Sequence, residues 1–169
     1  MNEALESYRR EMQGRIGLRH RQEIGLIDAR IIGRYAVAIN DADPLRFDPD
    51  HARKCGFEDV VASPNLLSAV TDWTAGSFES GLAPDGIRRD PATASLRVMG
   101  AGERLELLRP IVAGVSLIEE QVVERVEVKQ GRSGPIVFVT TRHEFSDKDG
   151  VIYNRNWRTI LARAEREDH

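Results

Sequence analysis

The sequence is short of several features that would define a protein class. Its 169 residues contain one cysteine, Cys55, so an internal disulfide is excluded. No apolar run approaches the roughly 20 residues that span a bilayer, and no signal-peptide pattern opens the chain. Positive charge is not in excess, because the formal net charge is -3 and the pI is about 5.8. These absences argue against a membrane protein and a nucleic-acid binder, and they make the cytoplasm the expected location.

Motifs for metals, phosphates and nucleophilic serines are missing as well. No glycine-rich phosphate loop and no G-x-S-x-G motif is present. No histidine lies at metal-ligand spacing from another; the 4 histidines are His20, His51, His143 and His169. We therefore expect no metal and no cofactor.

Length and composition fit one globular domain. Hydrophobic residues make up 41% of the chain and charged residues 30%, which is ordinary for such a domain. A chain of this length can bury a substantial core. We expect a single domain over residues 1–169, with residues 1–27 as an N-terminal helical extension and residues 164–169 as a charged tail.

The first half of the chain predicts helices. Asp28, Asp48 and Ser63 stand where N-caps are expected, and Pro49 and Pro64 follow two of them at the first helical turn. Residues 18–23 are too polar to assign, and residues 76–91 predict a long surface loop. Apolar residues at helical spacing place the helices at about residues 3–12, 29–39, 49–53 and 64–78.

The second half predicts antiparallel strands. Turns are expected at residues 131–134 and 147–150, and the glycines within residues 99–102 predict a bulge or a close approach of the backbone. Residues 117–129 are ambiguous, because their apolar positions follow helical spacing while their valines permit a strand. Helices followed by strands, without β-α-β alternation, predict the α+β class. The expected strands cover residues 94–108, 117–129, 136–141 and 151–161.

Polar residues crowd the turn after the second predicted helix. Pro44 fixes its own φ and moves Asp43 out of the helical region, so the helix must end before it. Asn40 and Asp41 have short side chains that can bond the nearby backbone. An ordinary turn therefore explains this segment without any function.

Residues 41–46, Asp-Ala-Asp-Pro-Leu-Arg, also resemble the D-x-N-P-x-H signature of MaoC-like (R)-specific enoyl-CoA hydratases. Asp43 stands where asparagine is usual, and Arg46 stands where the family has its catalytic histidine. The turn at residues 109–114 resembles the R-P-x-x-x-G turn common in MaoC-like proteins. The hairpin at residues 145–150 is similar to the FAS1-like dehydratase subgroup, which often lacks that histidine. The resemblance covers roughly residues 29–163. It implies a single hotdog fold, an antiparallel sheet wrapped around a central helix that starts near Ser63, and it makes residues 117–129 a strand.

The resemblance also implies site residues. It places Asp41 and Arg46 at the catalytic positions and Ser63 at a substrate-binding position. The amide of Asn65, at the start of the central helix, is a candidate donor to a thioester carbonyl. Arginine stays protonated and cannot act as a base, so we expect an ion pair that lowers the pKa of Asp41. We expect His51 to be an exposed helix residue.

Two functions follow from the resemblance. The first is an acyl-thioester-binding subunit that is itself non-catalytic, taking acyl-CoA or an acyl-carrier thioester within an (R)-specific enoyl-CoA hydratase or 3-hydroxyacyl dehydratase. Its partner would be a second copy or a catalytic MaoC-like subunit. The alternative is a self-sufficient homodimeric hotdog hydratase, dehydratase or acyl-CoA thioesterase that uses other residues.

Overall fold

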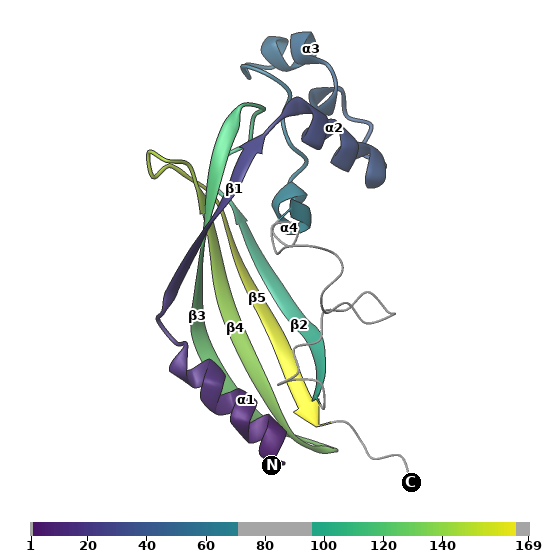
Figure 1. Cartoon of the computed structure of the whole chain (residues 1–169). Helices are drawn as coiled ribbons and strands as arrows, with labels where there is room; N and C mark the ends of the chain where they lie inside the picture. Colours follow the sequence, from purple (N-terminus) through teal and green to yellow (C-terminus); the bar gives the residue numbers. More distant parts are fainter. Residues whose placement is uncertain (1, 71–95, 165–169) are drawn as a thin grey trace, which may run out of the picture.

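The structure, a computed structural model, describes residues 2–70 and 96–164. In this part of the chain, five strands form one antiparallel sheet with the order β1-β3-β4-β5-β2, and short helices lie at its two ends (Figure 1). The elements in chain order are α1 (Glu3–Gly14), β1 (Arg19–Ile27), α2 (Ala29–Ala38), the 3-10 turn η1 (Pro44–Arg46), α3 (Pro49–Lys54), α4 (Leu66–Val70), β2 (Leu96–Leu107), β3 (Val115–Gly131), β4 (Gly134–Ser146) and β5 (Ile152–Ala164).

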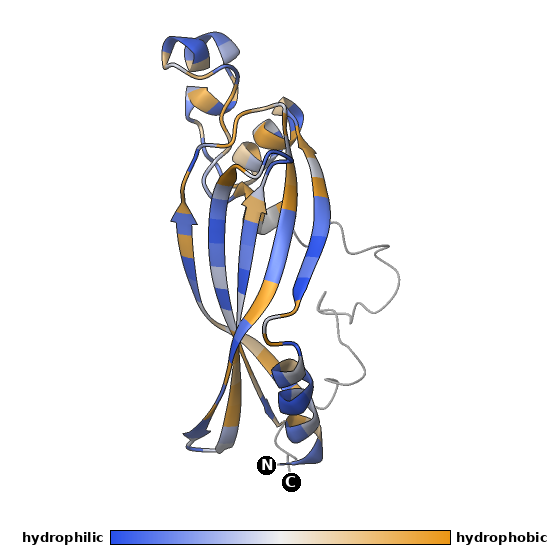
Figure 2. Ribbon diagram, turned by 90° about the vertical axis from the view of Figure 1, so that its left-hand side faces the viewer, coloured by the Kyte–Doolittle hydropathy of each residue, from blue (hydrophilic) through white to orange (hydrophobic). Residues whose placement is uncertain are grey.

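One face of the sheet carries both apolar clusters. Alternate residues of a strand point to the same face, so Val137, Val139 and Phe145 of β4 share one side. Val137 and Val139 pack with Leu5 and Tyr8 of α1, whereas Phe145 belongs to a second cluster that includes α4. Helices α1 and α4 therefore cover opposite ends of the same inner face. Bands of hydrophobic and hydrophilic residues along the strands reflect this one-sided burial (Figure 2).

The expected strand over residues 117–129 is confirmed as part of β3. Its apparent helical periodicity has a structural cause, because the pairing of β3 with β4 shifts between Val123 and Arg125. This irregularity moves the inward side chains from odd positions such as Leu117 to even positions such as Val126. A strand with such a bulge breaks strict alternation and imitates a helical pattern. The bulge predicted at Gly100–Gly102 is also present, in the pairing of β2 with β5.

The prediction that residues 1–27 form a helical extension is wrong for its second half. Residues Arg19–Ile27 form β1, which pairs with β3 at the edge of the sheet. The predicted order of helices followed by strands is wrong for the same reason. Five of the first six residues of β1 are polar or charged, and most of them are exposed. Such a composition suits an edge strand, which must avoid pairing with other chains. Such a strand lacks the apolar alternation by which strands are found in a sequence.

The start of the central helix is confirmed. The Leu66 N–H donates to the Ser63 carbonyl at 3.0 Å, and Leu66 and Leu67 are each 1% exposed beneath the sheet. The predicted continuation from Val70 to about Phe78, and the predicted loop at residues 76–91, lie outside the described residues. No helix among the described residues is long and apolar enough to cross a membrane.

Two isoleucines of α2 provide a matched test of the core. Ile32 is fully buried at 0% exposure, whereas Ile39, at the end of the same helix, is 48% exposed. We expect Ile32→Ala to lower the free energy of unfolding by about 2–5 kcal/mol, because it leaves a cavity in the α4 cluster. We expect Ile39→Ala to change it by about 0.5 kcal/mol or less. Urea denaturation of both variants checks this; equal losses would contradict the assigned packing.

Candidate functional site

The end of α2 fixes the position of Asp41. Asn40 has a left-handed backbone conformation with φ of 57°, which asparagine tolerates better than most residues. The Asn40 N–H bonds the Val37 carbonyl at 3.2 Å, and the Asp41 N–H bonds the Ala36 carbonyl at 2.8 Å. These two bonds form a Schellman motif, which reverses the chain and satisfies the last carbonyls of the helix. Asp41 therefore leaves a rigid helix end with its carboxylate facing the next segment.

The loop after Asp41 turns back on that carboxylate. The Asp43 N–H donates to Asp41 Oδ1 at 3.1 Å, and Asp43 Oδ1 accepts from the Leu45 N–H at 2.9 Å. Asp43 thereby caps the short 3-10 turn that begins at Pro44. One tight turn later, Arg46 returns its side chain toward Asp41.

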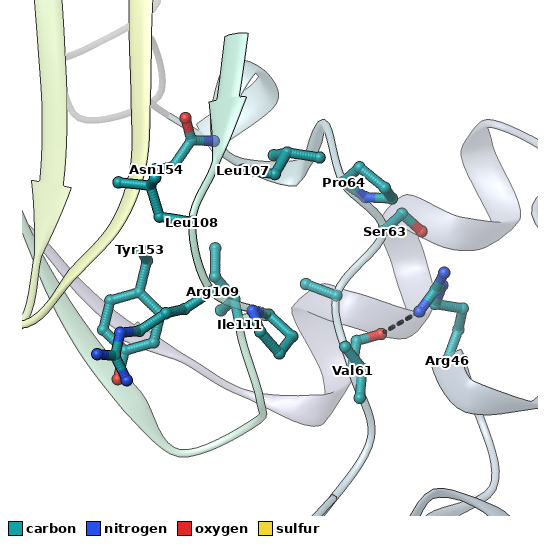
Figure 3. Close-up of a pocket in the computed structure, with 12 residues that line it drawn as sticks. Arg46, Val61, Ser63, Pro64, Leu107, Leu108, Arg109, Ile111, Tyr153 and Asn154 are labelled. Atoms are coloured by element: carbon teal, nitrogen blue, oxygen red, sulfur yellow. Dashed lines mark hydrogen bonds between the residues drawn. The ribbon is translucent and has the colours of Figure 1, made fainter. Parts of the chain in front are cut away.

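Arg46 donates two hydrogen bonds and forms one further ion-pair contact. Its Nε donates to Asp41 Oδ2 at 2.9 Å, and its Nη1 donates to the Val61 carbonyl at 3.1 Å. Its Nη2 lies 3.7 Å from Asp43 Oδ2, and the side chain is only 12% exposed. The bond to Val61 joins the loop to the segment that leads into α4 (Figure 3). The predicted ion pair is therefore present. It belongs to a wider set of contacts that joins Arg46 to Asp41, Asp43 and Val61, which we call the clamp.

Ser63 completes the arrangement from the start of the central helix. Its Oγ donates to Asp41 Oδ2 at 2.7 Å, and the residue is 2% exposed. The segment before it is held on both sides, because the Val61 N–H bonds the Leu45 carbonyl and the Ala62 N–H bonds the Ile111 carbonyl, each at 2.8 Å. Asp41 thus links the end of α2 to the segment that precedes α4.

These contacts determine the charge of Asp41. The hydrogen bond from Ser63, then that from Arg46, then that from the Asp43 amide lower the pKa of Asp41 to about 2. At neutral pH the carboxylate is ionised, has no proton to donate and is a weak base. Arg46 keeps its proton, so neither residue of the pair can accept or deliver a proton readily.

A pocket of about 320 Å³ opens beside this clamp. Arg46, Ser63 and Pro64 stand on one side of it, and Leu107, Tyr153 and Asn154 stand on the other (Figure 3). Its size suits a small-molecule site, as does its mixture of aliphatic side chains with a few polar groups. It can hold an apolar group while polar atoms fix the orientation of one end.

The structure brings three of the four predicted site residues together. Asp41, Arg46 and Ser63 form one hydrogen-bonded unit, and the latter two line the pocket. Asn65 follows the pocket residue Pro64 but is not among the described residues that line the pocket. Its role remains a prediction. His51 lies on α3 with its Nε2 3.6 Å from the Cys55 sulfur, and it does not line the pocket.

Sequence analysis missed the opposite wall. Arg109, Tyr153 and Asn154 line the pocket because the turn after β2 lies beside the start of β5. The turn at residues 109–114 was a signal for Arg109. No sequence pattern indicated Tyr153 and Asn154, because only the pairing of distant strands brings them to the pocket wall. No group of residues suited to hold a metal ion occurs in the described ranges 2–70 and 96–164.

Residues 15–153 match the family described as "FAS1-like, dehydratase domain region". The match covers most of the chain, and the chain belongs to this family. A UPF0336 protein of Saccharopolyspora erythraea is 30% identical over 139 residues, which cover 81% of each chain. A probable enoyl-CoA hydratase alpha subunit of Thermomonospora curvata is 24% identical over 176 residues, which cover 96% of this chain and 54% of that protein.

A solved structure shows the same fold. A chain of the C-terminally truncated HadBC (3R-hydroxyacyl-ACP dehydratase) complex from Mycobacterium tuberculosis superposes with a TM-score of 0.66 at 16% identity. The superposition covers 87% of this chain and 96% of that one. With the α+β architecture and the sheet packed on α4, this confirms the predicted hotdog fold.

The pKa of Asp41 gives a pH-dependent prediction. Because its folded pKa of about 2 lies below the usual aspartate pKa of 3.8, the ionised carboxylate stabilises the folded state at neutral pH. This contribution is present above pH 4 and is lost as the pH falls toward 2. We expect carbon-detected NMR to show Asp41 titrating near pH 2, and Ser63→Ala to raise that midpoint. Ser7→Ala, on the distant helix α1, is the control; an unshifted Asp41 midpoint in Ser63→Ala would refute the assigned cause.

Proposed function

We propose that this chain is the acyl-thioester-binding subunit of an (R)-specific enoyl-CoA hydratase or 3-hydroxyacyl dehydratase, and that a partner subunit supplies the acid and base. One observation carries the proposal: Arg46 occupies the histidine position of the signature and is held by Asp41 at 2.9 Å. Hydration of an enoyl thioester needs a group that activates water and returns a proton to the α-carbon. A permanently protonated guanidinium and a carboxylate with a pKa of about 2 do neither well.

The role we assign to Arg46 is structural. A histidine has two ring nitrogens, whereas the guanidinium has five N–H donors and reaches Asp41, Val61 and Asp43 at once. Arg46 therefore holds the pocket wall in place, although it cannot transfer a proton to the substrate. This interpretation explains why the signature aspartate is kept beside an arginine.

The pocket suits the acyl end of a thioester. Aliphatic side chains such as Leu107 and Ile111 line it, and Ser63 lies at the end nearest the clamp. The Asn65 N–H has no hydrogen-bond partner in the described part of the chain. We assign it as the donor to the thioester carbonyl, in keeping with its place before α4.

A partner subunit fits the architecture. Strands β1 and β2 are the two edges of the sheet, and an edge strand can pair with a strand of another chain. Two relatives support this by their descriptions, one as the alpha subunit of a probable hydratase and the other as part of a dehydratase complex. We propose a heterodimer in the cytoplasm with a chain that retains D-x-N-P-x-H, formed by side-by-side pairing of the two sheets.

The activity test compares the chain alone with the chain in complex. We expect the purified chain to hydrate trans-2-octenoyl-CoA at least about 10²-fold more slowly than its complex with a protein that is encoded by a neighbouring gene and contains the D-x-N-P-x-H motif. This is the loss of rate expected when a general acid or base is missing. The absorbance of the conjugated double bond follows the reaction. Ordinary turnover by the isolated chain, abolished by Asp41→Ala, would instead support the self-sufficient enzyme.

Variants at position 46 separate structure from catalysis. In the complex, we expect Arg46→Ala to lower the Tm while turnover by the folded complex changes by less than about tenfold, because the partner supplies the acid and base. Arg34→Ala, on the exposed face of α2, is the matched control and should change neither quantity. A loss of about 10²-fold or more with an unchanged Tm would show that Arg46 acts in the reaction itself.

A further inference from the structure

A band of polar residues crosses the inner face of the sheet between the two apolar clusters. Glu119 is 0% exposed, and its carboxylate accepts from the Gln22 amide and contacts His143 Nδ1, each at 2.6 Å. In the next strand, Asn156 is paired in register with His143. Asn154, two residues earlier on the same face of β5, lines the pocket. The band therefore runs from the pocket wall into the interior.

Two amides of this band have buried oxygens without a hydrogen-bond partner among residues 2–70 and 96–164. Asn154 is 3% exposed, and neither atom of its amide is bonded; its Oδ1 is completely buried. Asn156 is also 3% exposed, and its Oδ1 is buried without a partner. Buried polar groups in folded proteins are nearly always bonded, so two such amides on one face of β5, one of them in the pocket wall, mark a place where something binds.

The surroundings fix which of these atoms accept and which donate. The Asn156 Nδ2 donates to the Glu103 carboxylate, so its Oδ1 must be the atom that faces away as an acceptor. Glu119 is ionised, since hydrogen bonds from His143 and Gln121 outweigh the effect of burial on its pKa. The ionised carboxylate accepts a hydrogen bond from the Nδ1–H of His143. The band offers two acceptors, the Oδ1 atoms of Asn154 and Asn156, together with one donor, the amide nitrogen of Asn154.

We propose that this band is a subsite for a hydroxyl group on the acyl chain, so that the preferred thioester carries a hydroxylated acyl group instead of a plain alkyl chain. A hydroxyl group donates to one partner and accepts from another, which matches the Oδ1 acceptor of Asn156 and the amide donor of Asn154. A carboxylate or a ketone has no hydrogen to give to these acceptors. An ammonium group has no lone pair for the Asn154 amide.

The position of the subsite separates it from the reacting carbons. The clamp at Arg46 and Ser63 lies on the wall opposite Asn154. Asn156 lies two residues further along β5, which is about 7 Å deeper in a strand. The recognised hydroxyl group is therefore several carbon atoms away from the thioester carbonyl and differs from the one that hydration would create. This inference rests on the proposed binding of an acyl thioester in the pocket.

Calorimetric titration of the full-length chain tests the subsite. The probes are dodecanoyl-CoA and a set of hydroxydodecanoyl-CoA isomers with the hydroxyl group at successive positions from C5 to C12. We expect at least one isomer to bind about tenfold more tightly than dodecanoyl-CoA, the gain of one ordinary hydrogen bond. Asn154→Leu and Asn156→Leu should each reduce that preference toward one. Thr159→Val is the matched control, because Thr159 lies on the opposite face of β5 and bonds Thr140, and it should keep the preference.

Thermal unfolding gives a second readout that a purely structural role would not produce. An unbonded buried amide is unfavourable in the folded protein, so we expect Asn154→Leu to raise the Tm while it removes the hydroxyl preference. A fall in Tm for Asn154→Leu would show a structural amide and overturn the subsite. Equal affinity of the wild-type chain for dodecanoyl-CoA and every isomer would overturn the subsite but leave thioester binding intact. Failure to bind any of these thioesters would overturn the proposed function, and the subsite with it.

Discussion

The carboxylate of Asp41 joins the parts of the molecule that form the candidate site. It accepts hydrogen bonds from Ser63, Arg46 and the Asp43 amide, which come from the start of the central helix, the 3-10 turn and the residue that caps that turn. The Schellman motif at the end of α2 holds its backbone. One charged group thus sets the distance between α2 and the segment leading into α4. Without it, the ionised Arg46 would be left largely buried without its main partner, an arrangement that costs several kcal/mol in typical proteins.

The arginine at position 46 changes what this arrangement can do. A histidine beside the same aspartate would be a titratable pair near neutral pH, able to move a proton between water and substrate. The guanidinium instead stabilises the ionised carboxylate and reaches the Val61 carbonyl as well. The same backbone geometry therefore supports proton transfer in one case and a fixed wall in the other. Loss of the base and gain of rigidity are two consequences of a single residue.

Local signals made much of the fold and part of the site predictable. Asp28 caps α2, and the loop of residues 41–46 brings an aspartate and an arginine five residues apart into contact. The bond between Ser63 and Asp41 joins residues 22 positions apart, and no local pattern indicates it. Strand β1 was missed because exposed edge strands are polar. The pocket wall at Asn154 was missed because its place depends on the register of β5 with β4 and β2.

The inner face of the sheet departs from the usual pattern of an apolar interior. Leu117 and Phe145 pack on α4 at one end, and Val137 and Val139 pack on α1 at the other. A continuous apolar row between them would bury more nonpolar surface and would need no hydrogen bonds. The chain instead places Glu119 there, where burial opposes its charge and other side chains must compensate. Positions that lower stability are expected where binding requires them, so the polar band and the pocket it meets are best explained together.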